Sequence, residues 1–218
     1  KAGIEYRITG RHIININGAY IDRPPTIRNS FSNSRENHNF VDNLDTEKIY
    51  SMEGSYSMNV KPIKLNVTGY YTNFQNMTEI SFFFAQGLSG LEESSDFVSE
   101  IMGGTHRDHY GLEFGAESNI TSTIKLSSGV AFGEYIYTKN PNLYLTSDDI
   151  NGVVDYGTSF MKNYKVPGTP QRGYSFGIEH RDPKYWWVSA NGNYLTHNYL
   201  DISPILRTNN FYINPDDP

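Results

Sequence analysis

The sequence lacks cysteine and long apolar runs, and these two absences exclude several classes of protein. Without cysteine, neither a disulfide framework nor a thiolate metal site can form. The longest purely apolar stretch is Phe82–Ala85, far shorter than the roughly 20 residues that a helix needs to cross a bilayer. If the chain spans a membrane, it therefore does so with β-strands.

An excess of basic residues is also missing. The chain has 18 Lys and Arg against 24 Asp and Glu, which gives a net charge of −6. Binding to nucleic acid requires a stripe of Lys and Arg that neutralises phosphates, so we expect no nucleic-acid partner. The sequence also contains no Gly-rich phosphate loop and no Gly-x-Ser-x-Gly elbow. We therefore predict that the protein is not an enzyme and has no cofactor.

Aromatic residues are abundant although the chain is polar on average. It contains 17 Tyr and 12 Phe, yet its mean hydropathy is −0.56. Over residues 50–60 the even positions read Tyr, Met, Gly, Tyr, Met and Val, while the odd positions read Ser, Glu, Ser, Ser and Asn. Successive strand residues point to opposite faces, so this alternation predicts a strand with one apolar and one polar face. Similar alternation recurs in several later segments.

Short and long connections alternate along the chain. Short turns join four pairs of strand-like segments near residues 9–11, 61–62, 121–123 and 182–184, and long polar stretches follow over 23–46, 86–99, 138–170 and 203–218. In an up-and-down sheet, such alternation places every short turn at one end. The sequence predicts an all-β, antiparallel, up-and-down transmembrane β-barrel segment of about eight strands in four hairpins, with short periplasmic turns and long extracellular loops.

The polar positions carry both signs of charge beside many Gly, Ser and Asn residues. A soluble sandwich usually presents Lys- and Glu-rich strands to water, whereas this mixture suits a crowded aqueous lumen. A soluble sandwich or soluble barrel remains an alternative on composition alone. The charged residues that we expect to line the lumen are Glu53, Lys64, Glu113, Glu117, Lys125, Glu179 and Arg181.

The residue types of a metal or protease site occur together once. His106 and His109 flank Arg107 and Asp108, a combination that can bind metal or move protons. On a strand, however, a spacing of three residues directs the two imidazoles to opposite faces. The acidic pairs of the long loops lack the succession of oxygen ligands that a calcium loop needs. We therefore predict no catalytic residue and no metal site.

Several short motifs resemble a known family. They are Arg23-Pro24-Pro25, Ser34-Arg35-Glu36-Asn37, Asn43-Leu44 and Glu47-Lys48 in and after the first long loop, Gly168-Thr169-Pro170-Gln171, and Tyr185-Trp186-Trp187 before the last strand. Together they resemble the barrel of TonB-dependent outer-membrane receptors, particularly of the Bacteroidetes type. The resemblance extends over nearly the whole chain.

The resemblance implies a 22-stranded barrel in the bacterial outer membrane, occluded by an N-terminal plug. Such a receptor takes up a scarce nutrient, for example a metal chelate, glycan or peptide, with energy relayed by TonB. Residues 1–218 would be part of that one barrel domain, and the plug, the TonB box and the other strands would lie outside this sequence. The expected partners are membrane lipid, the plug, TonB through the missing N-terminal region, and a surface lipoprotein.

Loops on a rigid barrel commonly carry recognition. The loop residues that we expect to contact substrate are Arg23, Arg35, Glu36, Asn37, Tyr144 and Tyr156. A passive outer-membrane porin or structural barrel is the alternative function, followed by a barrel enzyme or a soluble carbohydrate-binding β domain.

Overall fold

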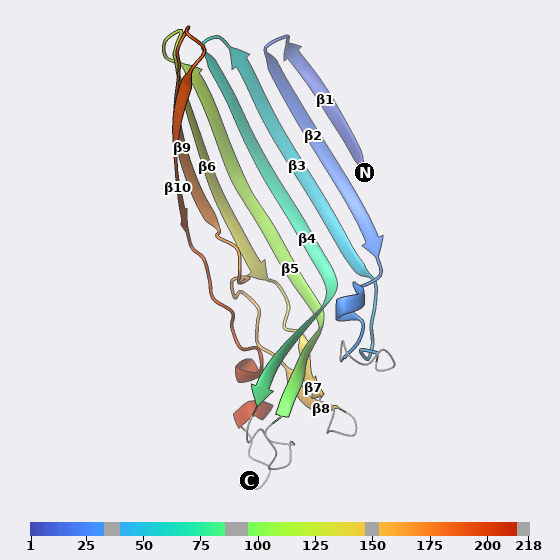
Figure 1. The fold of residues 1–218 in the computed structure, drawn as a ribbon. Helices are drawn as coiled ribbons and strands as arrows, with labels where there is room; N and C mark the ends of the chain where they lie inside the picture. The colour runs from blue at the N-terminus through green and yellow to red at the C-terminus, as the bar shows by residue number, and fades with distance from the viewer. Residues whose placement is uncertain (33–39, 86–95, 147–152, 213–218) are drawn as a thin grey trace.

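The computed structural model describes residues 1–32, 40–85, 96–146 and 153–212 (Figure 1). The strands are β1 (Ala2–Thr9), β2 (His12–Arg23), β3 (Glu47–Val60), β4 (Ile63–Ala85), β5 (Asp96–Asn119), β6 (Ile124–Tyr137), β7 (Asn142–Thr146), β8 (Val154–Thr158), β9 (Arg172–Arg181) and β10 (Trp187–Thr196). Three 3-10 helices of one turn each are η1 (Ile27–Asn29), η2 (Ile205–Arg207) and η3 (Asn210–Tyr212). Among the described residues, no helix has the length and apolar character to cross a membrane.

All ten strands belong to one antiparallel sheet. Eight of them follow the order β1-β2-β3-β4-β5-β6-β9-β10, and β7 pairs with both β5 and β8 beside this path. The all-β antiparallel prediction and the four predicted hairpins are confirmed. The expected number of about eight strands omitted β7 and β8, because each has only five residues and lies in the long polar stretch 138–170, which we expected to be a loop.

The register gives the sheet two chemically different faces. Directly opposite residues in antiparallel strands share a face, and one such row crosses five strands through Asn17, Glu53, Tyr70, Gly111 and Gly133. We call the side to which this row points the polar face and the opposite side the apolar face. The alternation read from the sequence is therefore carried coherently across the sheet.

Large hydrophobic side chains of the apolar face are exposed. Ile4 is 72% exposed, Met52 65% and Leu112 50%, and no second sheet covers them within the described ranges. A soluble sandwich would bury this face against another layer. Since burial of apolar surface contributes about 25 cal/mol per Å², a face of this kind is stable where its surroundings are themselves apolar.

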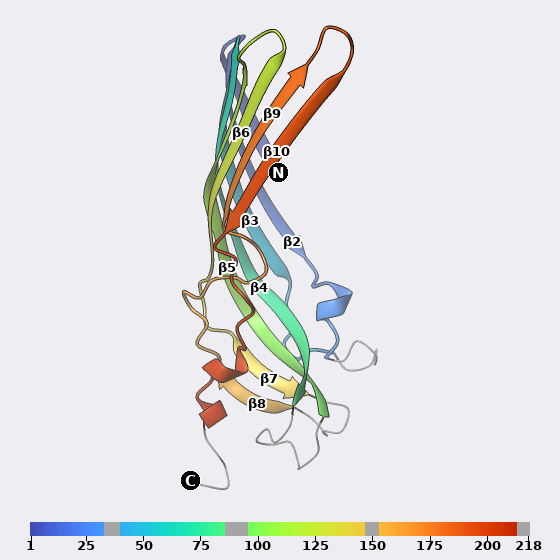
Figure 2. The same ribbon diagram turned by 60° about the vertical axis from the view of Figure 1, so that its left-hand side comes forward.

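Strands β4 and β5 are much longer than their neighbours, with 23 and 24 residues. A tilted strand needs only about 9–11 residues to span a bilayer. Their pairing is irregular between Phe74 and Glu79, and beyond this point the hairpin bends and continues to the long-loop end (Figures 1 and 2). We call the eight-strand part on the short-turn side of Phe74 the wall.

The outer part of the β4–β5 hairpin, β7, β8, residues 159–167 and residues 201–212 form a second region, which we call the cap. Figure 2 shows β7 and β8 at the end of the long hairpin. The cap has two buried apolar clusters. One contains Val98, Met102, Leu143, Leu145, Tyr156 and Ile205, and the other contains Tyr137, Met161 and Val166. The core of the described residues therefore lies in the cap, whereas the wall is a single layer.

Candidate functional site

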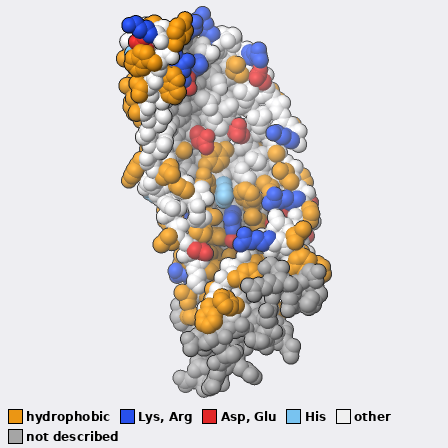
Figure 3. Space-filling model, in the orientation of Figure 1, with side chains coloured by type: hydrophobic (Ala, Val, Ile, Leu, Met, Phe, Trp, Pro, Cys, Tyr) orange, Lys and Arg blue, Asp and Glu red, His pale blue; other side chains and the backbone are white. Residues whose placement is uncertain are grey.

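The residues predicted to line a lumen share the polar face. Lys64 is opposite Glu117, and Lys125 is opposite Glu179. The remaining three of the seven residues fall on the same side by the same register: Glu53, Glu113 and Arg181. Figure 3 views the molecule from this side, with acidic, basic and histidine side chains across its middle. Whether this face lines an aqueous lumen stays a prediction.

Near the short turns, the charges of the polar face neutralise one another. Lys125 Nζ lies 3.0 Å from Glu117 Oε2, and Lys64 Nζ lies 3.8 Å from the same oxygen. Arg181 Nη2 lies 3.1 Å from Glu179 Oε1. Two carboxylates are thus shared by three cations, so most of the charge of these five side chains is compensated at this end of the sheet.

Two carboxylates in the middle of the wall differ from this group. Glu53 lies opposite Tyr70, and Glu113 lies opposite Thr68 on the neighbouring pair of strands. Among the described residues, neither carboxylate has an ion-pair or hydrogen-bond partner, and both are exposed. We call Glu53 and Glu113 the mid-wall carboxylates.

An aromatic band crosses β4, β5 and β6 beside these carboxylates. It consists of Tyr70, Tyr135, His109 and Phe74. The hydroxyl oxygens of Tyr70 and Tyr135 are 3.0 Å apart. The His109 ring lies 4.5 Å from the Tyr135 ring and 4.9 Å from the Phe74 ring, measured between centroids. Four rings from three strands thus form one continuous surface on the polar face.

Glycine makes room for the two tyrosines of the band. Gly111 and Gly133 are directly opposite one another. A Cβ atom on Gly111 would lie only 2.7 Å from the Tyr70 hydroxyl oxygen, and a Cβ on Gly133 would lie 3.0 Å from Cζ of Tyr135. The phenol ends therefore lie directly over the two glycines, where any other residue would push them away from the sheet.

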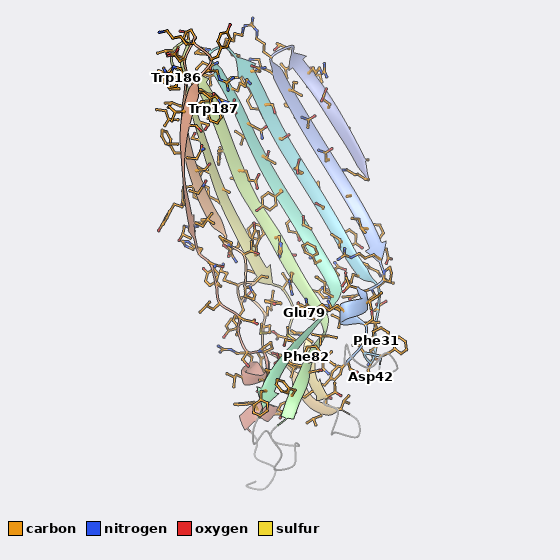
Figure 4. All side chains as sticks on the ribbon, in the orientation of Figure 1. Phe31, Asp42, Glu79, Phe82, Trp186 and Trp187 are labelled. Carbon is orange, nitrogen blue, oxygen red and sulfur yellow. The ribbon has the colours of Figure 1, made fainter. Side chains whose placement is uncertain are left out.

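A small cavity lies where the wall meets the cap. Glu79 forms an ion pair with Arg107, Tyr137 donates a hydrogen bond from its hydroxyl to Glu79 at 3.3 Å, and the Arg107 guanidinium lies 5.1 Å from the centre of the Tyr137 ring. Figure 4 marks Glu79 at this junction. The cavity has a volume of about 250 Å³, and Asp201 and Pro204 of the C-terminal segment also line it.

The predicted substrate-contacting residues have mixed surroundings. Arg23 Nε donates to Oε2 of the buried Glu47 at 2.8 Å, so its charge is compensated at the end of the β2–β3 pair. The Tyr144 hydroxyl accepts a hydrogen bond from the Asp42 backbone nitrogen at 3.2 Å, and burial raises the pKa of Tyr144 to about 12. Tyr144 thereby connects the first long loop to β7.

Tyr156, which we expected to contact substrate from a long loop, lies in strand β8. Its side chain is 3% exposed and belongs to an apolar cluster of the cap, so it is a core residue of the described structure. The short strand β8 places Tyr156 in this cluster, and the polar composition of residues 138–170 did not predict its burial. Arg35, Glu36 and Asn37 lie outside the described residues.

His106 and His109 do not converge. The His109 ring packs in the aromatic band, whereas His106 Nε2 lies 3.4 Å from Lys139 Nζ. Within the ranges that the structure describes, no group of three or more His, Asp or Glu side chains is placed to hold a metal ion.

The aromatic band and the junction cavity were not expected from the sequence. One signal was available for the band, because Tyr70 and Tyr135 are aromatic residues at positions where the alternation requires polar ones. The junction cavity had no such signal. Glu79, Arg107 and Tyr137 come from three strands and meet only through the pairing.

Comparison with known proteins finds a solved structure with a similar fold but no matching sequence family. No protein-family model matches the chain, and no curated protein sequence matches it. A solved structure, described as "Copper transporter OprC", matches 87% of this chain with a TM-score of 0.59 and 16% identity. The match covers 24% of that transporter's chain, so this sequence spans about a quarter of its length. The fold of the described residues is thus that of part of a transporter's β-barrel.

Proposed function

We propose that the chain is part of the barrel of a TonB-dependent outer-membrane receptor that takes up a scarce nutrient. The observation that carries this proposal is a single continuous sheet with an exposed apolar face, a charged polar face and the fold of part of a transporter barrel. A closed barrel is the form in which a sheet of this kind satisfies all its backbone hydrogen bonds within a bilayer. The motifs around Arg23-Pro24-Pro25 support the TonB-dependent type.

The apolar face supports a location in the membrane. Tyr6, Tyr20, Tyr50 and Tyr194 are exposed there together with aliphatic residues. Tyr side chains are favoured at the borders of a bilayer because the ring is apolar and the hydroxyl is hydrated. We infer that lipid surrounds this face in the outer membrane.

The cap supports a receptor in preference to a passive pore. It has its own buried clusters and encloses a cavity against the barrel wall. A passive pore requires only a hydrated lumen, whereas selective uptake requires a structured surface on which a ligand can be recognised. The cap supplies such a surface at the end where the long connections gather.

The name of the transporter with a similar fold does not identify copper as the substrate of this chain. At 16% identity the likeness concerns the fold, and function depends on the side chains placed on a fold. The sequence has no cysteine, and the described residues contain no group of three His, Asp or Glu side chains suited to a metal ion. The nutrient must therefore be identified from the polar face itself.

The test is whether uptake requires an energised inner membrane. The gene for the full-length protein would be deleted in its native host, and growth would be compared on media limited in iron, copper, glycan or peptide. We expect a growth defect on one medium that deletion of TonB reproduces. Normal uptake without TonB, together with steady ion conductance of the purified full-length protein in planar bilayers, would support a passive porin and overturn the proposal.

A further inference from the structure

We propose that the aromatic band is a binding platform for the sugar rings of a neutral glycan. This inference rests on the proposed function, because it requires that the polar face be the wall of a transport lumen. The band consists of Tyr70, Tyr135, His109 and Phe74, and the mid-wall carboxylates lie beside it.

The first support is the orientation of the tyrosines. The end of the Tyr70 ring lies over Gly111, because a Cβ there would be 2.9 Å from Tyr70 Cζ as well as 2.7 Å from its hydroxyl oxygen. The Tyr135 ring covers Gly133 in the same way. A ring that lies over a glycine has one side on the backbone and the other directed away from the sheet. Tyr70 therefore presents a flat aromatic surface to the space above the polar face, whereas the Tyr135 ring has His109 beside it and packs against the cap cluster of Tyr137, Met161 and Val166.

The second support is that the platform is already ordered. The hydrogen bond of 3.0 Å between the two tyrosine hydroxyls links β4 to β6 across β5. His109 packs against Tyr135 from the same side of the sheet. A ligand that binds to rings held in this way does not have to immobilise them, so less affinity is lost to side-chain ordering.

The third support is the chemistry around the rings. A pyranose ring has apolar C–H groups on its faces and hydroxyl groups at its edge. Stacking on Tyr70 would use the apolar face, and Glu53, which is directly opposite Tyr70, could accept hydrogen bonds from the hydroxyls. Glu113 has the same role from the neighbouring strand. Hydrogen bonds to an ionised carboxylate are stronger than those between neutral groups.

The remaining neighbours favour a neutral ligand. Around Glu53 and Tyr70 the polar face carries uncharged donors and acceptors, namely Asn17, Ser51, Ser55, Thr68 and Thr72. Such side chains suit a molecule with many hydroxyl groups. An acidic glycan would be repelled by the two mid-wall carboxylates, since like charges a few ångströms apart are unfavourable.

The test is equilibrium binding to the full-length protein in detergent. Neutral hexasaccharides prepared from starch, dextran, mannan and xylan would be titrated by calorimetry, with hexagalacturonate and hexalysine as charged comparisons. We expect at least one neutral hexasaccharide to bind. Tyr70→Leu removes the flat ring but keeps an apolar side chain, and it should weaken binding about tenfold, the size of the loss when one base-stacking ring is removed from a nucleic-acid-binding protein.

Matched variants separate the ring from the fold. Tyr70→Phe keeps the ring and loses the hydroxyl bond, so its affinity should remain within about threefold of the unmodified protein. Tyr71→Leu changes the next residue, which points to the apolar face, and should leave binding unchanged. Tyr135→Leu is a second test of the platform if Tyr70→Leu fails to fold, as judged by its heat-dependent migration on gels.

The outcomes distinguish this inference from the proposed function. Failure of every neutral hexasaccharide to bind, unchanged binding in both leucine variants of the band, or tighter binding of hexalysine or hexagalacturonate than of any neutral sugar overturns the inference. TonB-dependent uptake in that case leaves the proposed function standing. Sugar binding that is lost in Tyr70→Leu, together with uptake that survives deletion of TonB, overturns the proposed function and leaves the platform.

Discussion

The wall and the cap use the same kinds of hydrophobic residue in opposite ways. In the wall, Met52 and Leu112 point outward and remain exposed, whereas in the cap Val98 and Leu143 are completely buried. The wall is a single layer without an apolar interior in the described residues, and under the proposed function its apolar face would be covered by lipid. The cap resembles a small water-soluble domain, because its apolar residues cover one another.

The change between the two regions occurs within single strands. Strand β5 contains both Leu112, which is exposed, and Val98, which is buried, and the pairing irregularity between Phe74 and Glu79 of β4 separates the two environments. Bulges of this type bend a strand and alter the direction of the side chains that follow. We therefore predict that the same type of substitution changes stability differently on the two sides of this pairing irregularity.

The largest expected effect is the loss of a buried cap side chain. Leu143→Ala should destabilise the cap by about 2–5 kcal/mol, because it removes buried methyl groups and leaves a void. Hydrogen exchange of the β7 amides in the full-length protein would measure this. Leu112→Ala is the matched wall substitution and should leave exchange in β7 unchanged. Equal protection of β7 in both variants would show that the cap has no separate core.

The next largest effect is expected when an arginine is placed on the apolar face of the wall and compared with an arginine on its polar face. Leu112→Arg places a charge on the apolar face and should cost about 2–4 kcal/mol if that position is near the bilayer midplane. Ser55→Arg places the same side chain on the polar face, where it remains hydrated, and should cost much less. Denaturant unfolding of the full-length protein from lipid vesicles measures both. Equal costs would contradict the assignment of lipid to one face.

The wall could be predicted from the sequence and the cap could not, for a physical reason. Alternation of side chains is a local property of a strand, so residues such as Glu113 and Lys125 could be assigned to one face without knowledge of the pairing. The cap depends on contacts between residues far apart, for example Asp42 with Tyr144 and Glu100 with Ile205. Contacts of this kind leave no periodic pattern.

The same reason explains the outcome for the candidate site. The seven charged residues of the polar face were found from their spacing, but the division into paired and unpaired charges required the register. Tyr156 was misplaced because a strand of five residues is too short to show alternation. Tyr70 and Tyr135 had a local signal, because they are aromatic residues at strand positions where the alternation predicts polar ones. Such departures from the pattern are expected at functional positions.

A third prediction concerns the attachment of the C-terminal segment to the cap. Glu100 is 4% exposed. Its Oε1 accepts a hydrogen bond from the Ile205 backbone nitrogen at 3.0 Å, and its Oε2 accepts one from Ser81 Oγ at 2.8 Å. Glu100→Ala would leave these two donors without their partner and should cost about 1–3 kcal/mol. Hydrogen exchange of the Thr208 amide, which lies in the same segment, would measure this loss of stability.

The same carboxyl should make this attachment depend on pH. Burial raises the pKa of Glu100, Asp201 adds to this effect, and the hydrogen bonds from Ser81 and Ile205 oppose it. Because the pKa is raised in the folded protein, the stabilisation is complete below the pKa of the unfolded chain and is lost as pH rises through the folded value. Glu100→Gln should abolish this dependence, measured as Thr208 amide protection corrected for intrinsic exchange. A dependence that persists in Glu100→Gln would assign it to another group.

The smallest expected effect tests whether water fills the space beside the polar face. Lys125 and Glu117 are 40% and 43% exposed in their side chains, so Lys125→Gln should cost less than about 1 kcal/mol, and the cost should fall further in high salt because ions screen hydrated charges. Denaturant unfolding of the full-length protein at low and high salt measures both. A cost of several kcal/mol that salt does not change would mean that the pair is dry. The short-turn end of the polar face would then be packed against protein, and the contrast between a hydrated wall face and a self-contained cap would hold only nearer the long loops.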